Sequence, residues 1–223
     1  MEQGRVDEAI KQFEKTLEIR PSDSGAENNL GVAFASKGRW DEAQVHFQRA
    51  TDLEPSSADF HNSLALVLLQ KGRADEAAVQ FQKTLKIRPA DAVAHSYLGH
   101  ILFGKGRWRE AIQHYEAAVA TQPQSPFTLN NLAWALATCQ DASLRDAPRA
   151  VSLAEQAVQV SGGKDALILE TLAAAYAEAG RYDDAMKTGQ IGLDLADRQH
   201  NASLSALLRE QMGHYKAGVK TNR

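Results

Sequence analysis

Residues 30–55 read LGVAFASKGRWDEAQVHFQRATDLEP, and residues 64–89 read LALVLLQKGRADEAAVQFQKTLKIRP. The second stretch repeats the first 34 residues later, with a leucine, a Gly-Arg pair, an alanine, a phenylalanine and a proline at matching places. The Gly-Arg pair keeps this spacing along the chain, at Gly4-Arg5, Gly38-Arg39, Gly72-Arg73 and Gly106-Arg107. A fixed period of this length indicates a stack of similar supersecondary units rather than a single globular core.

Each repeat carries the pattern of two helices. Leu30, Ala33 and Phe34 have helical spacing before the glycine, and a second helical pattern with Ala43 and Phe47 follows it. The recurring alanine lets the two helices approach, and the recurring Phe or Tyr fills the gap to the next helix. A helix pair of this size cannot bury its apolar face alone, so neighbouring pairs must stabilise it.

The residues between and after the helices explain how they are connected. Gly38 lies between the two patterns, where a left-handed C-terminal cap needs a residue without a side chain. Asp41 and Glu42 favour the start of the second helix through capping and the helix dipole. Pro55 prevents that helix from continuing. The sequence therefore predicts helix, tight turn, helix and stop in every unit.

Composition excludes several kinds of function. The net charge of -3 argues against a nucleic-acid or anionic-membrane surface. No stretch approaches the length of apolar sequence that spans a bilayer, and the N-terminus is not a signal peptide. Cys139 is the single cysteine, so no intrachain disulfide and no cysteine-based metal site can form. We expect no cofactor and no metal, and a cytoplasmic rather than a periplasmic location.

These recurring residues resemble the tetratricopeptide repeat family. Three regular units match it closely, at 24–57, 58–91 and 92–125, with Leu30-Gly31, Leu64-Ala65 and Leu98-Gly99 in the first helices. The resemblance implies an all-α fold, a right-handed solenoid of antiparallel helix pairs with about twelve helices. It also implies a concave groove lined by the first helix of each pair. We expect residues 1–223 to form a single array of this kind.

The N-terminal end departs from the pattern. Residues 1–23 hold only the second helix of a first repeat, because Gly4 occupies the place of the turn between two helices. We therefore expect the chain to be a fragment of a longer protein or the product of a shortened gene. Val6, Ile10, Phe13 and Leu17 form an apolar stripe whose outer side lacks a partner. This stripe, within residues 5–19, is predicted to mediate self-association.

The C-terminal units depart as well. Residues 126–165 form a repeat with a lengthened turn, and Pro148 is predicted in the first turn of the following helix. This segment resembles a variant unit near the end of many bacterial tetratricopeptide proteins. Residues 166–199 form a divergent repeat, in which Gly189 and Gly192 replace larger residues and predict a looser second helix. Residues 200–223 are predicted to hold a capping helix and a tail.

The candidate binding residues are those that flank the recurring leucine of each first helix. The family resemblance places them in the groove: Asn28, Asn29, Asn62, Ser63, Ser96, Tyr97, His100, Phe103, Asn130, Asn131, Trp134, Glu170 and Thr171. An asparagine amide offers both a donor and an acceptor, so a row of them could bracket the backbone of an extended peptide. This row partly resembles the groove of the O-linked N-acetylglucosamine transferase repeats, although Ser63 and Tyr97 interrupt it. Tyr97, Phe103 and Trp134 could add apolar anchors.

The sequence points to a non-catalytic scaffold that binds an extended or helical segment of a partner protein in the groove. Cys139 has no identifiable base or orienting partner, and we expect no enzymatic activity. Two alternatives stay open. One is a substrate-recruiting domain of a larger enzyme such as a glycosyltransferase, and the other is a scaffold that self-assembles through its N-terminal helix.

Overall fold

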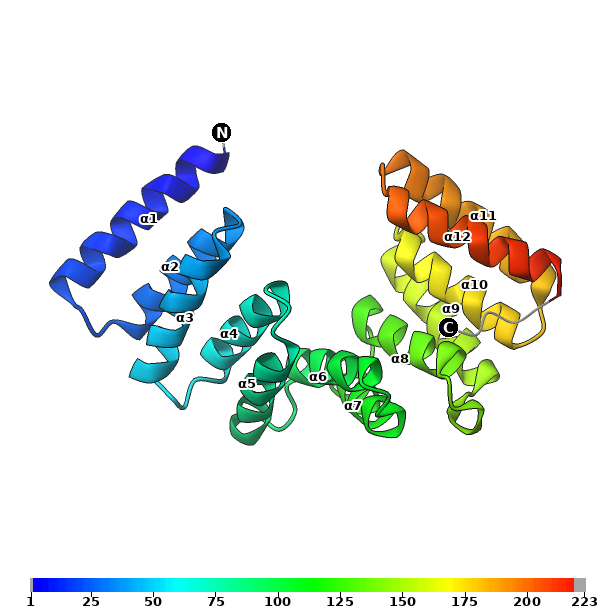
Figure 1. Ribbon diagram of the computed structural model, residues 1–223, viewed down its shortest axis with the longest axis horizontal. Helices are drawn as coiled ribbons and strands as arrows, with labels where there is room; N and C mark the ends of the chain where they lie inside the picture. The colour runs from blue at the N-terminus through cyan, green and yellow to red at the C-terminus, as the bar shows by residue number, and fades with distance from the viewer. Residues whose placement is uncertain (1, 219–223) are drawn as a thin grey trace. The chain divides into compact units, whose positions relative to one another are not determined.

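The structure is a computed structural model that describes residues 2–218, and within them it is entirely helical, without strands. Figure 1 shows the helices in chain order. They are α1 (Glu2–Ile19), α2 (Ser24–Ser36), α3 (Trp40–Leu53), α4 (Ala58–Gln70), α5 (Ala74–Ile87), α6 (Ala92–Gly104), α7 (Trp108–Thr121), α8 (Pro126–Thr138), the 3-10 helix η1 (Ala142–Leu144), α9 (Ala147–Ser161), α10 (Ala166–Glu178), α11 (Tyr182–Arg198) and α12 (Ala202–Lys216).

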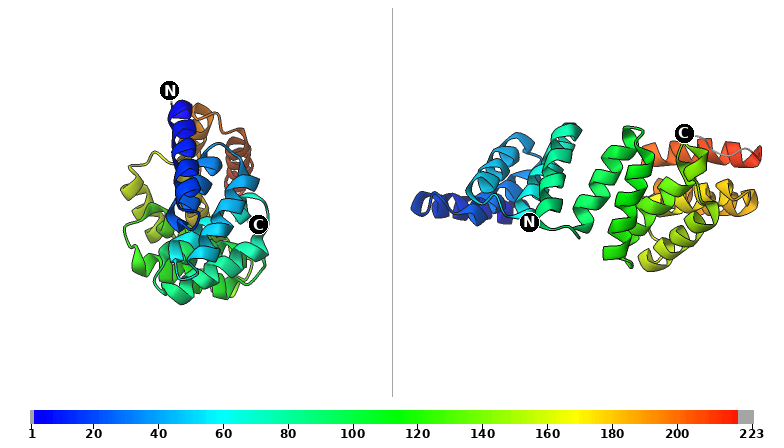
Figure 2. Two further views of the ribbon diagram at one scale, coloured as in Figure 1. Left: turned by 90° about the vertical axis from the view of Figure 1, so that its left-hand side faces the viewer. Right: turned by 90° about the horizontal axis from the view of Figure 1, so that it is seen from below.

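The chain divides into two compact units within α6, so that unit 1 ends at Ile101 and unit 2 begins at Leu102. In each unit, successive helices pack against one another as antiparallel pairs, which the three views make visible (Figures 1 and 2). Below, α2, α4, α6, α8 and α10 are called first helices, and α1, α3, α5, α7, α9 and α11 second helices. This arrangement confirms the predicted all-α solenoid of helix pairs.

The turn glycines adopt the conformation that the sequence predicts. Gly38, Gly72, Gly106 and Gly180 have φ between 70° and 76°. The Gly38 amide donates to the carbonyl of Ala35 at 2.9 Å, and the Arg39 amide donates to that of Phe34 at 3.0 Å. These bonds satisfy the last carbonyls of the first helix and reverse the chain. Gly4 differs from the prediction because it lies inside α1, where no preceding helix offers carbonyls to hold such a turn.

The start of the second helices also differs from the prediction. The residue before α5, Arg73, makes no side-chain capping bond, and neither Asp75 nor Glu76 caps the helix. Instead, the Arg73 guanidinium donates to the Glu76 carboxylate across one turn, with Nε 2.6 Å from Oε1. The same exposed pair recurs as Arg39–Glu42, Arg107–Glu110 and Arg181–Asp184. Side-chain caps occur on first helices, where Asp23 accepts from the Ala26 amide at 2.8 Å.

Small and large residues alternate in the core as the period predicts. Ala43, Ala77, Ala111 and Ala185 have no exposed surface, and Phe47, Phe81 and Tyr115 are buried. Phe47 of α3 packs its ring directly on Gly31 of α2. The leucines of the first helices are buried as well, at Leu30, Leu64, Leu98, Leu132 and Leu172. Burial of these apolar side chains between helices is the main favourable contribution to folding.

The lengthened turn of unit 2 is fastened to its neighbours. Pro148 lies in the first turn of α9, as predicted. Ahead of it, Arg145 Nε donates to the Cys139 carbonyl at 2.6 Å, and its Nη1 lies 3.3 Å from Glu178 Oε2 on α10. Both charged side chains are largely buried. The extra residues therefore form an ordered connection held by a largely buried ion pair.

The predicted looseness of α11 is wrong. A Cβ on Gly189 would lie 3.1 Å from Met212 of α12, and one on Gly192 would lie 3.3 Å from Leu169 of α10. The two glycines therefore let α10 and α12 approach α11 closely. The apolar stripe of α12 is confirmed, since Leu204, Leu208 and Tyr215 are buried against this unit.

Candidate binding surface on the first helices

Adjacent residues of the first helices face different ways. The inner position comprises Asn28, Asn62, Ser96 and Asn130, each 34 residues after the last. In all four, the side-chain oxygen is buried and has no hydrogen-bonding partner. Asn62 uses its amide nitrogen to donate to Asp91 Oδ1 at 3.2 Å. These oxygens are closed to a ligand in this structure, and Ser96 and Asn130 are buried as whole residues.

The outer position is the next residue of each helix: Asn29, Ser63, Tyr97 and Asn131. Asn29 is exposed, and the other three are half-buried. The row that reaches the surface thus reads Asn, Ser, Tyr, Asn rather than a run of asparagines. This composition gives the surface a mixed apolar and polar character and removes the continuous asparagine row from its description.

Unit 1 has a pocket of about 350 Å³ at the outer position. It is lined mainly by apolar side chains, with two polar groups: Val32, Ala35, Trp40, Phe47, Ser63, Leu66, Val67, Gln70 and Tyr97. The Tyr97 ring stacks on Phe81, with centroids 5.5 Å apart and planes 3° from parallel. This stacking holds one wall of the pocket in place.

Sequence reasoning missed two residues of this pocket, Val32 and Leu66. Both share a repeat position with His100 and Trp134, which the sequence did single out. Adding the period backwards from His100 gives Leu66 and then Val32. Val32 is half exposed and His100 is exposed, so this position also faces outward in unit 1.

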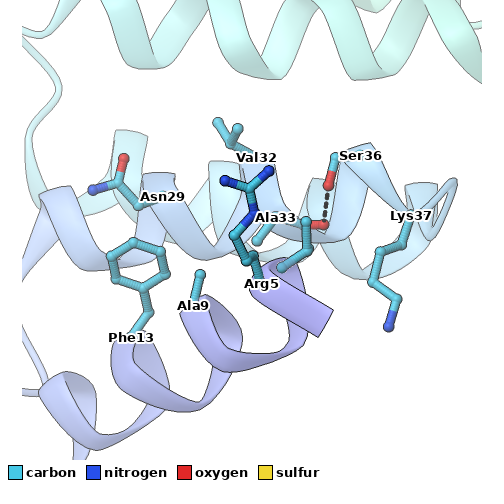
Figure 3. A pocket seen from close by; sticks show the side chains of 9 residues that line it. Arg5, Ala9, Phe13, Asn29, Val32, Ala33, Ser36 and Lys37 are labelled. Carbon is cyan, nitrogen blue, oxygen red and sulfur yellow. Dashed lines mark hydrogen bonds between the residues drawn. The ribbon is translucent and has the colours of Figure 1, made fainter. Parts of the chain in front are cut away.

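A second hollow, the N-terminal groove, lies between α1 and α2 and has a volume of about 720 Å³. Its lining is Arg5, Val6, Ala9, Phe13, Asn29, Val32, Ala33, Ser36 and Lys37. Figure 3 shows Phe13 and Ala9 of α1 and Asn29 and Val32 of α2 bordering it. Val32 lines both this groove and the pocket beside Tyr97, so the two hollows adjoin. At the rim, the Lys37 ammonium pairs with Asp7 and lowers the pKa of that carboxyl.

In unit 2, two aromatic candidates meet. The rings of Phe103 and Trp134 have centroids 4.6 Å apart and planes inclined by 51°, and both side chains are half-buried. Asn131 lies three residues before Trp134 on α8, hence on the same side of that helix. These residues form a second patch of aromatic and amide groups.

Two predicted groove residues have a different role. Glu170 and Thr171 are buried in α10. Glu170 Oε1 accepts from Gln211 Nε2 of α12 at 2.5 Å, and Thr171 Oγ1 donates to the Leu167 carbonyl at 3.2 Å. The capping helix therefore closes this part of the surface, and both residues stabilise the end of the array.

Other features offer little chemistry. Burial raises the pKa of the Cys139 thiol, and the residue has no exposed surface. His61, which shares a repeat position with His95, is buried and bonds through its two ring nitrogens to Gln80 Oε1 and the Pro55 carbonyl. Among the described residues, no three acidic, histidine or cysteine side chains are grouped to hold a metal ion. Within the same residues, no helix combines the length and the apolar character that a bilayer crossing requires.

Paired helices with a 34-residue period and an open face on the first helices define a repeat protein of the helical-solenoid class. The tetratricopeptide repeat profile matches residues 1–45, 37–92 and 68–132. The chain belongs to this family, whose members are typically protein-interaction scaffolds.

Solved structures of similar fold support the assignment. A chain of the Cut9–Hcn1 hetero-tetramer of the APC/C matches with a TM-score of 0.74 at 17% identity, over 95% of this chain and 41% of that one. YrrB, described as a tetratricopeptide protein with an unusual peptide-binding site, matches with a TM-score of 0.65 at 18% identity, over 89% and 97%. PilF of Pseudomonas aeruginosa matches with a TM-score of 0.60 at 19% identity, over 93% and 91%. At these identities the likeness concerns the fold. No curated protein matches the sequence.

Proposed function

We propose that the chain is a non-catalytic scaffold that binds a segment of a partner protein across the outer face of its first helices. The observation that carries this proposal is the pocket in unit 1 beside Tyr97. Its walls are apolar side chains from α2, α3, α4 and α6, which lie far apart in the sequence and converge here. Such a convergence of apolar side chains with a few polar groups is typical of a recognition site.

The size of the pocket indicates what it takes. A volume of about 350 Å³ suits one or two large apolar side chains rather than a whole helix. The stacked Tyr97 offers a rigid wall, so a bound side chain would lose little further freedom there. Ser63 and Gln70 at the same pocket supply a hydroxyl and an amide for hydrogen bonds to a partner backbone.

The surface also favours a partner of limited charge. Val32, Leu66 and Tyr97 are uncharged, and the recurring Arg residues of the turns are already paired with Glu or Asp. We therefore propose a partner segment with one or two large apolar residues flanked by uncharged polar ones. In unit 2, Phe103, Asn131 and Trp134 offer a second patch of the same chemistry.

The proposal that the chain is not an enzyme rests on Cys139. Burial and a raised pKa keep its thiol from acting as a nucleophile. The self-association predicted from residues 5–19 stays a separate prediction, because it concerns the N-terminal groove and not the outer face of the first helices.

A selection experiment with matched variants tests the binding surface. Peptides selected from a random library against the whole chain are measured against Val32→Glu and Val79→Glu. Both valines are 50% exposed, but Val32 lies on the first helix α2 and Val79 on the second helix α5. We expect Val32→Glu to weaken binding at least tenfold and Val79→Glu to leave it within twofold. Equal effects of the two substitutions, or an effect of Val79→Glu alone, would place binding elsewhere.

A further inference from the structure

Helix α1 occupies the place of a second helix with respect to α2. Lys37 of α2 pairs with Asp7 of α1, and Lys71 of α4 pairs with Asp41 of α3, which are the same two positions one period later. Arg5, Ala9 and Phe13 of α1 therefore correspond to Arg39, Ala43 and Phe47 of α3. This correspondence shows what α1 would contact if its own first helix were present.

In the α2–α3 pair, the first helix covers these residues. Phe47 lies on Gly31 of α2 and is only 4% exposed, whereas Phe13 is half-buried and borders the N-terminal groove. Ala43 has no exposed surface, whereas Ala9 is partly exposed. The N-terminal groove is thus the unfilled side of α1 at the positions that a first helix fills elsewhere.

The occupied repeats also define the occupant at a second point. The Arg39 guanidinium lies 4.4 Å from the ring centroid of Phe34, which follows Gly31 by three residues. In unit 2, the Arg181 guanidinium lies 4.2 Å from the ring of Tyr176, which follows Ala173 by three residues. Arg5 lines the groove at the matching place. An occupant with a small residue opposite Phe13 and an aromatic one three residues later would complete both contacts.

We propose that the N-terminal groove docks an amphipathic helix from a partner protein that carries leucine, a small residue, two further residues and an aromatic residue in that order. The small residue receives the Phe13 ring, the aromatic ring stacks under Arg5, and the leucine packs towards α2. This surface and its occupant differ from the outer face of the first helices, which takes side chains of a segment lying across them.

A second copy of this chain does not supply such a helix. The five helices that carry the leucine and the small residue all bury that leucine within their own unit, at Leu30, Leu64, Leu98, Leu132 and Leu172. Helix α1 itself has Ile10 and Phe13 but no small residue placed to receive a phenylalanine ring from a copy. The chemistry therefore favours a helix from another protein over an α1–α1 contact.

The test uses a synthetic peptide with the sequence of residues 22–38, which contains the α2 pattern with its cap and its terminal glycine. Its binding to the whole chain is measured by fluorescence anisotropy. We expect saturable binding that falls at least tenfold with Phe13→Ala in the chain, and that is lost with Gly31→Leu in the peptide. Lys11→Ala, on the exposed side of α1, is the matched control and should change affinity less than twofold.

Because the Gly31→Leu change is made in the peptide, the result does not depend on how Phe13→Ala folds. No saturable binding at millimolar peptide, or equal binding of the Gly31→Leu peptide, would overturn the proposal. A concentration-dependent dimer of the chain that Phe13→Ala abolishes would also overturn it, and would assign the groove to self-association. Val32→Glu weakens selected peptides under the proposed function, so failure of either proposal leaves the other testable.

Discussion

A Cβ atom on Gly31 would lie 2.7 Å from two ring carbons of Phe47. This distance is shorter than real side-chain contacts, so the ring of the second helix occupies the space that any other residue on the first helix would need. The pairing of these two residues, one from each helix, sets how closely α2 and α3 approach.

Substitution of Gly31 by alanine is therefore expected to destabilise the array. The added methyl group forces the Phe47 ring to shift, and overpacking of this kind costs about 2 kcal/mol. Urea unfolding followed by circular dichroism measures the change. The double variant Gly31→Ala with Phe47→Leu should lose less than the sum of the two single changes, because the smaller side chain leaves room for the methyl group. Strict additivity would contradict the contact.

The turn glycines predict a different kind of cost. Gly72 has φ of 72°, and a Cβ there would meet nothing within 4 Å. Gly72→Ala should therefore destabilise by about 1 kcal/mol through backbone strain alone. Gly104 also has open space around it but lies in α6 with ordinary backbone geometry. Gly104→Ala should be neutral or stabilising in the same thermal melt, and equal losses would contradict the assignment.

The ion pairs between neighbouring repeats predict a pH dependence. Arg88 Nη1 lies 2.9 Å from Asp59 Oδ1, and this hydrogen bond lowers the pKa of the Asp59 carboxyl. A carboxyl with a lowered pKa in the folded state stabilises the fold above its unfolded pKa of about 3.9, and the contribution is lost as the pH falls through the folded value. Asp59→Asn should therefore lower the melting temperature at pH 6 but not below pH 3. A difference that persists at low pH would exclude the ion pair as its cause.

The buried thiol predicts slow chemistry. Cys139 has no exposed surface and a pKa raised by burial, so little thiolate forms near neutral pH. Reaction with iodoacetamide at pH 8 should be at least tenfold slower in the folded chain than in urea. Mass spectrometry of the alkylated protein measures both rates. Equal rates would show that the segment around η1 opens readily and that the Arg145–Glu178 pair does not hold it.

The sequence predicted the helix pairs, the left-handed glycines and the capping helix because each depends on local pattern and on one repeated period. It did not separate Asn28 from Asn29. Neighbouring residues on a helix point about 100° apart, and two asparagines give no contrast in polarity to show which one faces outward. The family resemblance therefore included both, and the structure buries the side-chain oxygen of one and exposes the other.

Other differences arose from contacts between elements distant in the sequence. Glu170 and Thr171 lost their place on the surface because α12 packs across α10 and Gln211 bonds to Glu170. Gly189 suggested a loose helix until Met212 was found against it. In each case the residue type allowed two interpretations, and only the path of α12 decides between them.

The central claim is that a partner segment lies on the outer face of the first helices, with a large side chain in the pocket beside Tyr97. The most direct measurement is methyl NMR of valine- and leucine-labelled chain, titrated with a peptide selected for binding. The account predicts the largest shifts at Val32 and Leu66, with Val45 and Val79 of the second helices unchanged. Shifts at Val45 and Val79, with Val32 and Leu66 unaffected, would contradict it.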